Sequence, residues 1–280
     1  MKKPFRWNIE KRNELGSLVN DTPNGIDGEF LNELIKTTSR IIAFSDNSRL
    51  FFVGRSPENY FDFLKGIYLN KDEKSDLLNL FQFSGRHLDD DSTNKKSIKN
   101  LKEYMNNIDL SPEGILKSER NTVLIDLVYT GSTMRNLISI IREWSTDEKT
   151  DWNGIKRKLR IVGITERTKN SPNTWRWHQQ AKSIDILDGI QVKNVSVTWK
   201  FWSELGNNQS KVTPSNSPEK WDKEQITQPK INEHYLEGLN FAYNLSSLGQ
   251  NKEIKAKLKN EMQKQNEMKN KWFKEWYNAI

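Results

Sequence analysis

The chain has 280 residues, enough for one large domain or for a domain with an appendage. It contains no cysteine and only three histidines, which excludes disulfides, thiolate chemistry and cysteine zinc sites. The formal net charge of +7 favours anionic partners such as nucleotides or phosphosugars, although a lysine-rich stretch after Asn251 supplies part of the excess. No run of about eighteen apolar residues occurs and no apolar signal core follows the first lysines, so we expect a cytoplasmic protein that does not enter a membrane.

The first half of the chain predicts alternating helices and strands. Apolar residues at helical spacing predict a helix over 28–39, and the apolar run LFFV predicts a strand over 50–53. This strand runs into Gly54-Arg55-Ser56-Pro57, where Pro57 suits the first position of a helix and Ser56 the cap before it. A strand, a tight turn and a helix are therefore expected in this order.

The stretch from about 70 to 120 is highly polar. It contains the acidic run Asp89–Asp91, which is more typical of a solvated flap than of a magnesium site. One helix is predicted over 95–107. We interpret the whole stretch as an insertion or hood that lies outside the core.

Two strands with nearly continuous apolar runs are predicted over 123–127 and 160–164, with a helix over 134–144 between them. Such runs are typical of strands that are buried on both faces. Strands that alternate with helices indicate a parallel sheet. The sequence therefore predicts an α/β fold with a Rossmann-like parallel sheet in a domain that spans residues 1–230.

The last part of the chain changes in character. A strand over 192–197 and a short helix over 199–205 precede a long polar loop over 206–229. Two helices are then predicted, over 235–248 and 252–279. We treat residues 231–280 as an α-helical C-terminal extension of the domain.

The loop after the 123–127 strand carries the functional prediction. Ligands of open α/β sheets bind at the carboxyl ends of the strands, where Asp126 stands. Gly131 lets the backbone approach a ligand closely, and the first amides of the following helix favour an anion. The hydroxyls of Thr130, Ser132 and Thr133 can add hydrogen bonds. These residues predict a phosphate site, with Asp126 placed to reach ribose hydroxyls or a Mg²⁺ ion held by them.

The segment VLIDLVYTGST over 123–133 resembles the phosphoribosyl diphosphate (PRPP) signature of type I phosphoribosyltransferases. That signature is a hydrophobic strand, two acidic residues and a loop that ends in Thr-Gly-x-Thr. The resemblance implies that Thr130, Gly131, Ser132 and Thr133 hold the 5-phosphate. It also implies that Asp126 holds the ribose hydroxyls and, through them, a Mg²⁺ cofactor.

The chain departs from the signature at two positions. Ile125 replaces the first acidic residue, and Tyr129 stands where an acidic residue or threonine often precedes the Thr-Gly pair. The resemblance places Asp126 and Tyr129 at the catalytic positions. Both departures concern activation of the ribose or the base rather than binding of the phosphate.

The resemblance extends more weakly to other segments between residues 40 and 200. It implies that Gly54, Arg55 and Ser56 bind pyrophosphate, although the same residues also suit an ordinary turn. Residues near the base are expected after the 160–164 strand, where the alternatives are solvated charges and loop packing. The candidates for this base side are Arg167, Lys169, Trp175 and Trp177, with Trp199 and Trp202 as further aromatic residues that can stack on a base.

Three functions fit these features. The first is an enzyme, a pentosyltransferase similar to a divergent bacterial branch of the phosphoribosyltransferases, which transfers or removes a phosphoribosyl group. The second is a sensor or effector in a stress or defence system that binds PRPP or a nucleotide without turnover. The third is an accessory protein that binds nucleic acid through Lys252, Lys255 and Lys259 of the basic tail. The tryptophan-bearing side of that tail is expected to pack on the domain or on another subunit, so a homo-oligomer is possible.

Overall fold

The computed structural model describes residues 4–10, 12–19, 25–85, 95–170, 173–216 and 230–280. In this part of the chain a five-stranded sheet forms the centre, with the order β2-β1-β3-β4-β5. Every neighbouring pair of strands is parallel. The strands are β1 (Arg49–Val53), β2 (Leu78–Phe81), β3 (Thr122–Leu127), β4 (Leu159–Glu166) and β5 (Gln191–Val197). The predicted α/β class with a parallel sheet is confirmed.

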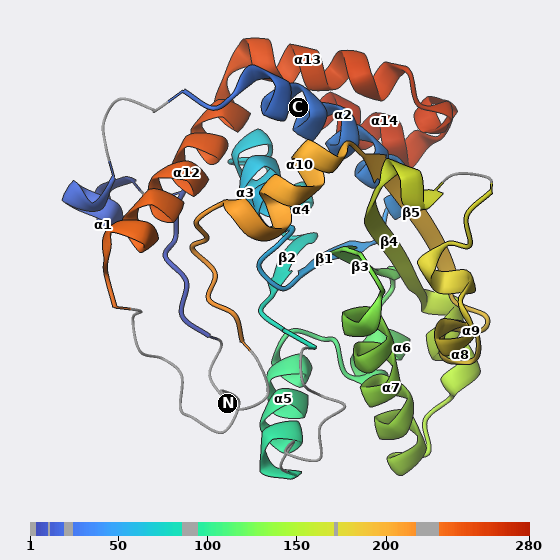
Figure 1. The fold of residues 1–280 in the computed structure, drawn as a ribbon. Coiled ribbons are helices and arrows are strands. Elements are labelled where there is room, and N and C mark those ends of the chain that lie inside the picture. The colour runs from blue at the N-terminus through green and yellow to red at the C-terminus, as the bar shows by residue number, and fades with distance from the viewer. Residues whose placement is uncertain (1–3, 11, 20–24, 86–94, 171–172, 217–229) are drawn as a thin grey trace.

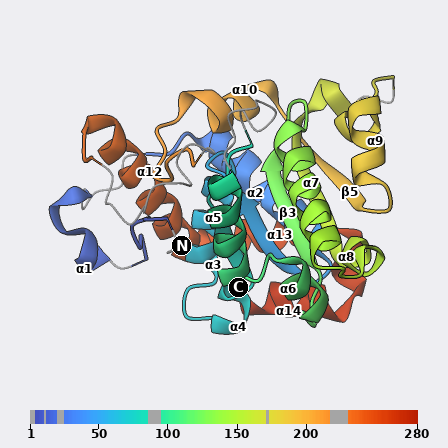
Figure 2. The ribbon, with the colours of Figure 1, turned by 90° about the horizontal axis from the view of Figure 1, so that it is seen from below.

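Helices cover both faces of the sheet, as the two perpendicular views show (Figures 1 and 2). The helices on one face are α2 (Gly28–Ser45), α3 (Glu58–Ile67), α10 (Trp199–Ser203), α12 (Glu233–Gln250), α13 (Lys252–Gln263) and α14 (Lys271–Ala279). Those on the other face are α5 (Lys95–Asn107), α6 (Pro112–Lys117), α7 (Ser132–Asp147), α8 (Trp152–Lys158) and α9 (Ala181–Leu187). The short helices α1 (Arg12–Leu15) and α4 (Asp72–Ser75) lie outside these layers.

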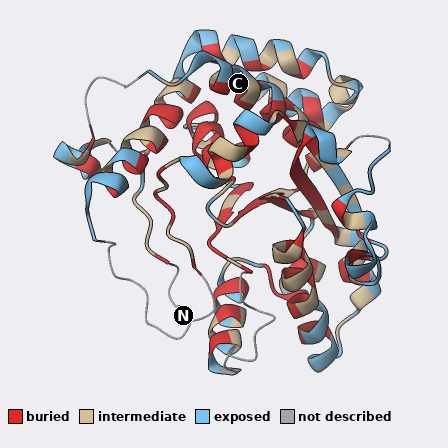
Figure 3. Cartoon of the chain, viewed as in Figure 1, coloured by how far each residue is buried: buried red, intermediate tan, exposed pale blue. Residues whose placement is uncertain are grey.

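Each face of the sheet has its own apolar core. Along β3, Val123 and Ile125 belong to the core under α2 and α3, whereas Leu124 belongs to the core under α7. All three side chains are fully buried, and the central strands β1, β3 and β4 are mostly buried, as Figure 3 shows. Successive side chains of a strand point to opposite faces, so burial on both faces requires the continuous apolar run that the sequence shows.

The C-terminal helices belong to the same core as the sheet. Helix α12 packs along α3, and α13 packs on α2. The buried residues of α13 and α14 are Ile254, Leu258, Met262, Phe273 and Trp276. The single helix predicted over 252–279 is wrong, because α13 ends at Gln263 and a 3₁₀ turn at Asn266–Lys269 redirects the chain into α14. This break lets both helices bury their apolar sides in one core.

The interpretation of 70–120 as an insertion outside the core is also wrong. This stretch supplies β2, which pairs with β1 at the edge of the sheet, and α5, whose Leu101 and Tyr104 are fully buried. The apolar residues of β2 form a short run, Leu77–Phe83 with Asn79 and Gln82 inside it, and such a run is hard to distinguish from a helical segment by its pattern alone. The predicted helix over 95–107 is confirmed as α5. The acidic run Asp89–Asp91 lies outside the described residues.

No helix in the described part of the chain is both long enough and apolar enough to span a bilayer.

Candidate functional site

A cavity of about 210 Å³ opens at the carboxyl edge of the sheet, beyond the ends of β1 and β3. The strand order reverses its direction at this place. From β1 the chain moves outward to β2 on one side, and it returns to β3 on the other side, so the connections diverge and leave a crevice. The residues that line the cavity include 54–56 and 126–133, the two segments that the sequence singled out separately. Residues 206–207 and 214–216 form a further wall.

The loop before α7 is shaped by Gly131. Its φ of 78° lies in the left-handed region, and a Cβ atom there would come within 2.2 Å of the Trp177 ring. Because Gly131 occupies the cap position and has no side chain, no side chain of the cap residue satisfies the first amides of α7. The Arg135 guanidinium donates to the Thr130 carbonyl at 2.7 Å and holds the loop in place. The 16-residue helix therefore presents an uncapped N-terminus to the cavity, which favours an anion.

Asp126 lies at the end of β3 and lines the same cavity. Its side chain is 8% exposed and forms no ion pair with a described residue. Burial raises the pKa of the carboxyl group well above its usual range, and a hydrogen bond from the Leu127 amide opposes this only in part. A buried acid with a raised pKa at the edge of a cavity is typical of a functional site.

The turn after β1 forms the opposite wall. Gly54 has a φ of 75°, and a Cβ atom there would lie 2.9 Å from the Phe83 carbonyl, so the backbone passes close to the loop after β2. Arg55 is exposed, and its guanidinium makes no hydrogen bond or ion pair with any residue described. Ser56 is not the helix cap as predicted, because α3 begins at Glu58 and Pro57 takes the cap position. The serine hydroxyl is thereby left at the cavity.

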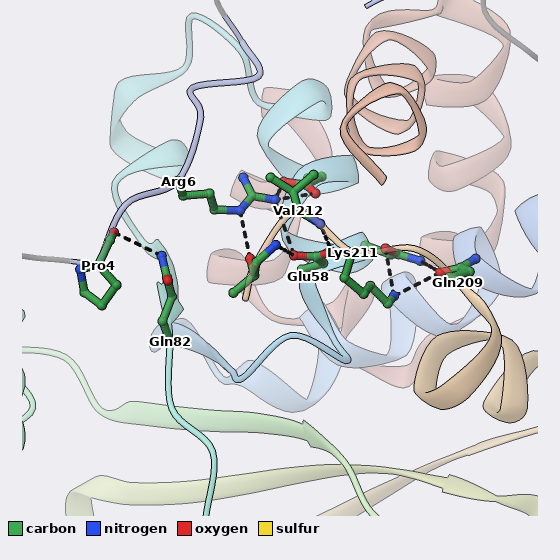
Figure 4. Close-up of polar contacts among 10 residues, drawn as sticks. Pro4, Arg6, Glu58, Gln82, Gln209, Lys211 and Val212 are labelled. Atoms are coloured by element: carbon green, nitrogen blue, oxygen red, sulfur yellow. Dashed lines mark hydrogen bonds and ion pairs between the residues drawn. The ribbon is translucent and has the colours of Figure 1, made fainter. Parts of the chain in front are cut away.

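The third wall is the end of a segment that we call the strap, residues 209–216. Its backbone is held by the buried Glu58 carboxylate, which accepts the Val212 amide at 3.1 Å and the Thr213 amide at 2.8 Å (Figure 4). Arg6 donates to the Thr213 hydroxyl at 3.0 Å and to both carboxylate oxygens of Asp62 at 2.7 Å. The N-terminal segment and α3 thus fix the strap against the cavity.

The charges behind the strap are strongly perturbed by burial. Burial raises the pKa of Asp62 to about 7, although Arg6 acts in the opposite direction. Burial also lowers the pKa of Lys211 to about 8, and its ammonium group donates to the Gln209 side chain at 2.9 Å (Figure 4). The sequence analysis missed this cluster, because its members are scattered along the chain and no local pattern connects them.

The aromatic residues Tyr129 and Trp202 line the cavity at its mouth, and a third, Trp199, lies beyond it. Tyr129 is 57% exposed, and its ring centroid lies 5.8 Å from that of Trp202. Trp199 stacks on Trp202 with a centroid distance of 5.4 Å and an interplanar angle of 11°. On its other side Tyr129 meets Lys169, whose ammonium nitrogen lies 5.3 Å from the ring centroid. Such an arrangement can stack on a planar ligand.

The four predicted base-side residues are not brought together. Lys169 lies at the rim of the cavity, because its ammonium group contacts the ring of Tyr129. Arg167, in contrast, lines a separate groove. Trp175 is 75% exposed and does not line the cavity. Trp177 is buried behind Gly131, where its Nε1–H donates to the Asn194 side chain at 2.9 Å, so it supports the loop rather than facing a ligand.

The site does not contain a ready-made metal centre. No group of three or more histidine, aspartate or glutamate side chains in the described part of the chain is arranged to hold a metal ion. Asp126 is the one carboxylate among the described residues that line the cavity. These donors do not fit a Mg²⁺ ion held by the protein alone, but they fit an ion that arrives with the phosphate and ribose oxygens of a ligand.

Comparisons with known proteins do not assign the chain to a family. No family model matches it, and neither a curated protein nor a solved structure matches it at a significant level. Its function must therefore be inferred from the cavity and its chemistry.

Proposed function

We propose that the cavity binds PRPP or a 5-phosphoribosyl nucleotide, and that the protein is a phosphoribosyltransferase-like enzyme. The observation that carries this proposal is that 54–56 and 126–133 line one cavity. The sequence resemblance gave these two segments complementary roles toward one ligand, although about seventy residues separate them. The parallel pairing of β1 with β3 brings the two turns to one edge of the sheet, and the residue types in the two turns match one phosphorylated ligand.

The lining residues suggest how such a ligand binds. The 5-phosphate accepts hydrogen bonds from the first amides of α7 and from the hydroxyls of Thr130, Ser132 and Thr133. Asp126 accepts hydrogen bonds from ribose hydroxyls. The free guanidinium of Arg55 pairs with the pyrophosphate from the opposite wall. The exposed ring of Tyr129 lies at the mouth, on the side of the base.

Phosphoribosyl transfer builds positive charge on the sugar ring, so electrostatic positioning is the main contribution of the protein. Asp126 is suited to this task because its carboxyl group is buried and becomes a close negative charge once it ionises. A Mg²⁺ ion that enters with the ligand would neutralise pyrophosphate charge as the bond breaks. Tyr129, held beside Lys169, occupies the position from which a group can act on the base.

One observation favours a second candidate, a sensor that binds the same ligand without turnover. Ile125 takes the place of the first acid of the signature, and its side chain is fully buried in the core on the α2 side of the sheet. No carboxylate from that position reaches the cavity. The stabilisation of the sugar cation then depends on Asp126 alone among the described lining residues.

Calorimetric titration of PRPP with Mg²⁺ tests the proposal. Thr133→Ala removes one hydrogen bond to a charged phosphate, worth about 1.5–3 kcal/mol, so we expect affinity to fall roughly 10- to 100-fold. Asp126→Asn should weaken binding as well. Thr146→Ala and Asp147→Asn, at the far end of α7, are the matched controls and should bind like the wild type.

The proposal is wrong if the wild type binds neither PRPP nor any 5′-nucleotide. Release of pyrophosphate from bound PRPP separates the enzyme from the sensor. An enzyme releases pyrophosphate with an acceptor base or water present, whereas a sensor binds PRPP and leaves it intact.

A further inference from the structure

An aromatic ladder leads out of the cavity. It consists of Tyr129, Trp202 and Trp199, in which each ring contacts the next. Tyr129 and Trp202 line the cavity, whereas Trp199 lies beyond it and is 57% exposed. The buried Nε1–H of Trp202 has no hydrogen-bond partner in the described structure. A single nucleotide in the cavity would reach the first rings and leave the outer ring uncovered.

A basic groove begins where the ladder ends. Thr198, the residue before Trp199, lines a groove of about 620 Å³ together with Lys36, Arg40 and Arg167. These three cations form no ion pair with any residue that the structure describes. Thr198 precedes Trp199 directly in the chain, so the groove begins beside the segment that carries the outer ring of the ladder.

The carboxylates of the basic groove are already engaged. Glu33 accepts the backbone amide of Thr198 at 2.6 Å and its hydroxyl at 2.5 Å. Glu29 is paired with Lys200 at 2.7 Å. Glu29 and Glu33 line the groove beside the three cations, so among the described lining residues the cations exceed the carboxylates by one and leave a net positive charge for an external anion.

A phosphate cradle, a series of aromatic rings and a basic groove follow one another along this surface. Aromatic rings that stack bases, beside cations that follow the backbone, are the usual means of binding single-stranded nucleic acid. Bases in a duplex are already stacked on one another and are not free to stack on the ladder. Asp126 lies where a 2′-hydroxyl can donate to it, and this hydroxyl is what distinguishes RNA from DNA.

We propose that the cavity takes the 5′-phosphorylated end of a single-stranded RNA, whose following bases stack on the aromatic ladder. This inference rests on the proposed 5-phosphoribosyl site and specifies its substrate class. The terminal phosphate occupies the Thr130–Thr133 loop, the first base covers the exposed ring of Tyr129, and a later base covers the exposed ring of Trp199, while the buried Trp202 holds the two rings in place. The backbone then continues toward Lys36, Arg40 and Arg167.

The test is fluorescence anisotropy with a five-nucleotide RNA that carries a 5′-phosphate and a 3′ label, compared with competition by AMP. We expect the RNA to bind at least about tenfold more tightly than AMP, since stacking on one ring contributes about 1–3 kcal/mol per base. Trp199→Ala should remove most of this advantage and leave the affinity for AMP unchanged. Trp175→Ala, which removes an even more exposed tryptophan off the ladder, is the control.

Two further comparisons make the test specific. The same RNA with a 5′-hydroxyl and the corresponding 5′-phosphorylated DNA should both bind more weakly. Arg40→Ala removes one phosphate contact. It should therefore reduce the slope of log affinity against log salt concentration by about one. Melting temperatures equal to that of the wild type show that the surface variants fold.

Separate outcomes contradict the two proposals. If AMP or PRPP binds but RNA binds no more tightly, or if Trp199→Ala does not weaken RNA binding, this inference is overturned and the phosphoribosyl site stands. RNA binding that ignores the 5′-phosphate, or equal binding of DNA, also overturns it. Absence of binding by every 5′-phosphorylated ligand overturns both proposals.

Discussion

Asp126 is a carboxyl group that the fold buries at the end of β3 without an ion pair among the described residues. Its raised pKa means that the empty site favours the protonated acid, because burial disfavours the charged form. A ligand that supplies hydroxyl donors and a cation reverses this preference. The residue therefore reduces the stability of the empty protein at neutral pH. Under the proposed function it improves binding of the ligand, as is common at functional positions.

The raised pKa of Asp126 predicts that the effect of Asp126→Asn on stability depends on pH. The unfolded carboxyl group titrates near pH 3.9 and the folded one at higher pH, so the folded state holds the proton more tightly. The contribution of Asp126 to stability is full below about pH 4 and is lost as the pH rises through the folded pKa. We expect the variant to match the wild type near pH 4 and to be more stable at pH 8.

Thermal unfolding measured across this pH range checks the prediction. Asp147→Asn serves as control, since the Asp147 side chain is 69% exposed on the same side of the sheet. Parallel curves for the wild type and Asp126→Asn would contradict the assignment of a raised pKa.

The sequence predicted the roles of some single residues but not of others. Gly131 was expected to permit a close approach, and the structure shows a left-handed φ of 78° there. The neighbour at Gly131 is Trp177, which arrives from a segment after β4. Sequence spacing gives no measure of such a contact, so Trp177 was predicted at the base side although it supports the loop from behind.

The strap is an element without regular structure that owes its position to two others. Glu58, in the first turn of α3, binds its backbone, and Arg6 ties it to the N-terminal segment. The same α3 follows the turn 54–56, so the strap and this wall of the cavity share one support. We infer that loosening this support alters the cavity wall.

Glu58→Gln tests that link. An amide can accept only through its single oxygen, so one of the Val212 and Thr213 amides loses its partner, at a cost of about 1–3 kcal/mol. We expect faster hydrogen–deuterium exchange in a peptide covering 209–216, together with weaker binding of PRPP. Glu143→Gln, on the exposed side of α7, is the control. Unchanged exchange in the strap would show that Glu58 does not hold it.

At this scale the sequence predicted the elements whose signals are local. The strands β1, β3, β4 and β5 and the helices α5 and α7 follow from apolar runs and helical spacing. The strap was predicted only as part of a polar loop, because its stability comes from Arg6 at a separation of 207 residues from Thr213. Long-range hydrogen bonds of this kind produce no periodic pattern in a sequence.

Across the whole molecule, the C-terminal helices complete the layer that covers one face of the sheet. Trp276 of α14 is fully buried, and the Tyr68 hydroxyl donates to its backbone carbonyl at 3.2 Å. The Tyr68 and Trp276 rings meet edge to face with centroids 5.0 Å apart. Residues 231–280 thus stabilise the sheet-bearing part of the chain rather than standing apart from it.

Trp276→Ala should therefore destabilise the whole domain. Removing a buried tryptophan from a core costs about 3–5 kcal/mol, and we expect a single unfolding transition at lower urea concentration. Trp175→Ala, at an exposed position, should change the free energy of unfolding by less than about 0.5 kcal/mol. A variant that loses only the C-terminal helices, with the remaining unfolding transition unmoved, would show that these helices are an independent unit.

The contact between Tyr68 and Trp276 spans 208 residues, and this separation has a consequence for synthesis. At about 5–20 residues per second, the ribosome delivers Trp276 roughly 10–40 s after Tyr68. During this interval the face of the sheet that α13 and α14 cover is open to water, with apolar side chains of α2 and α3 exposed. The cavity is completed only after residues 214–216 of the strap have emerged, and the apolar face of the sheet is covered later still, when α13 and α14 follow.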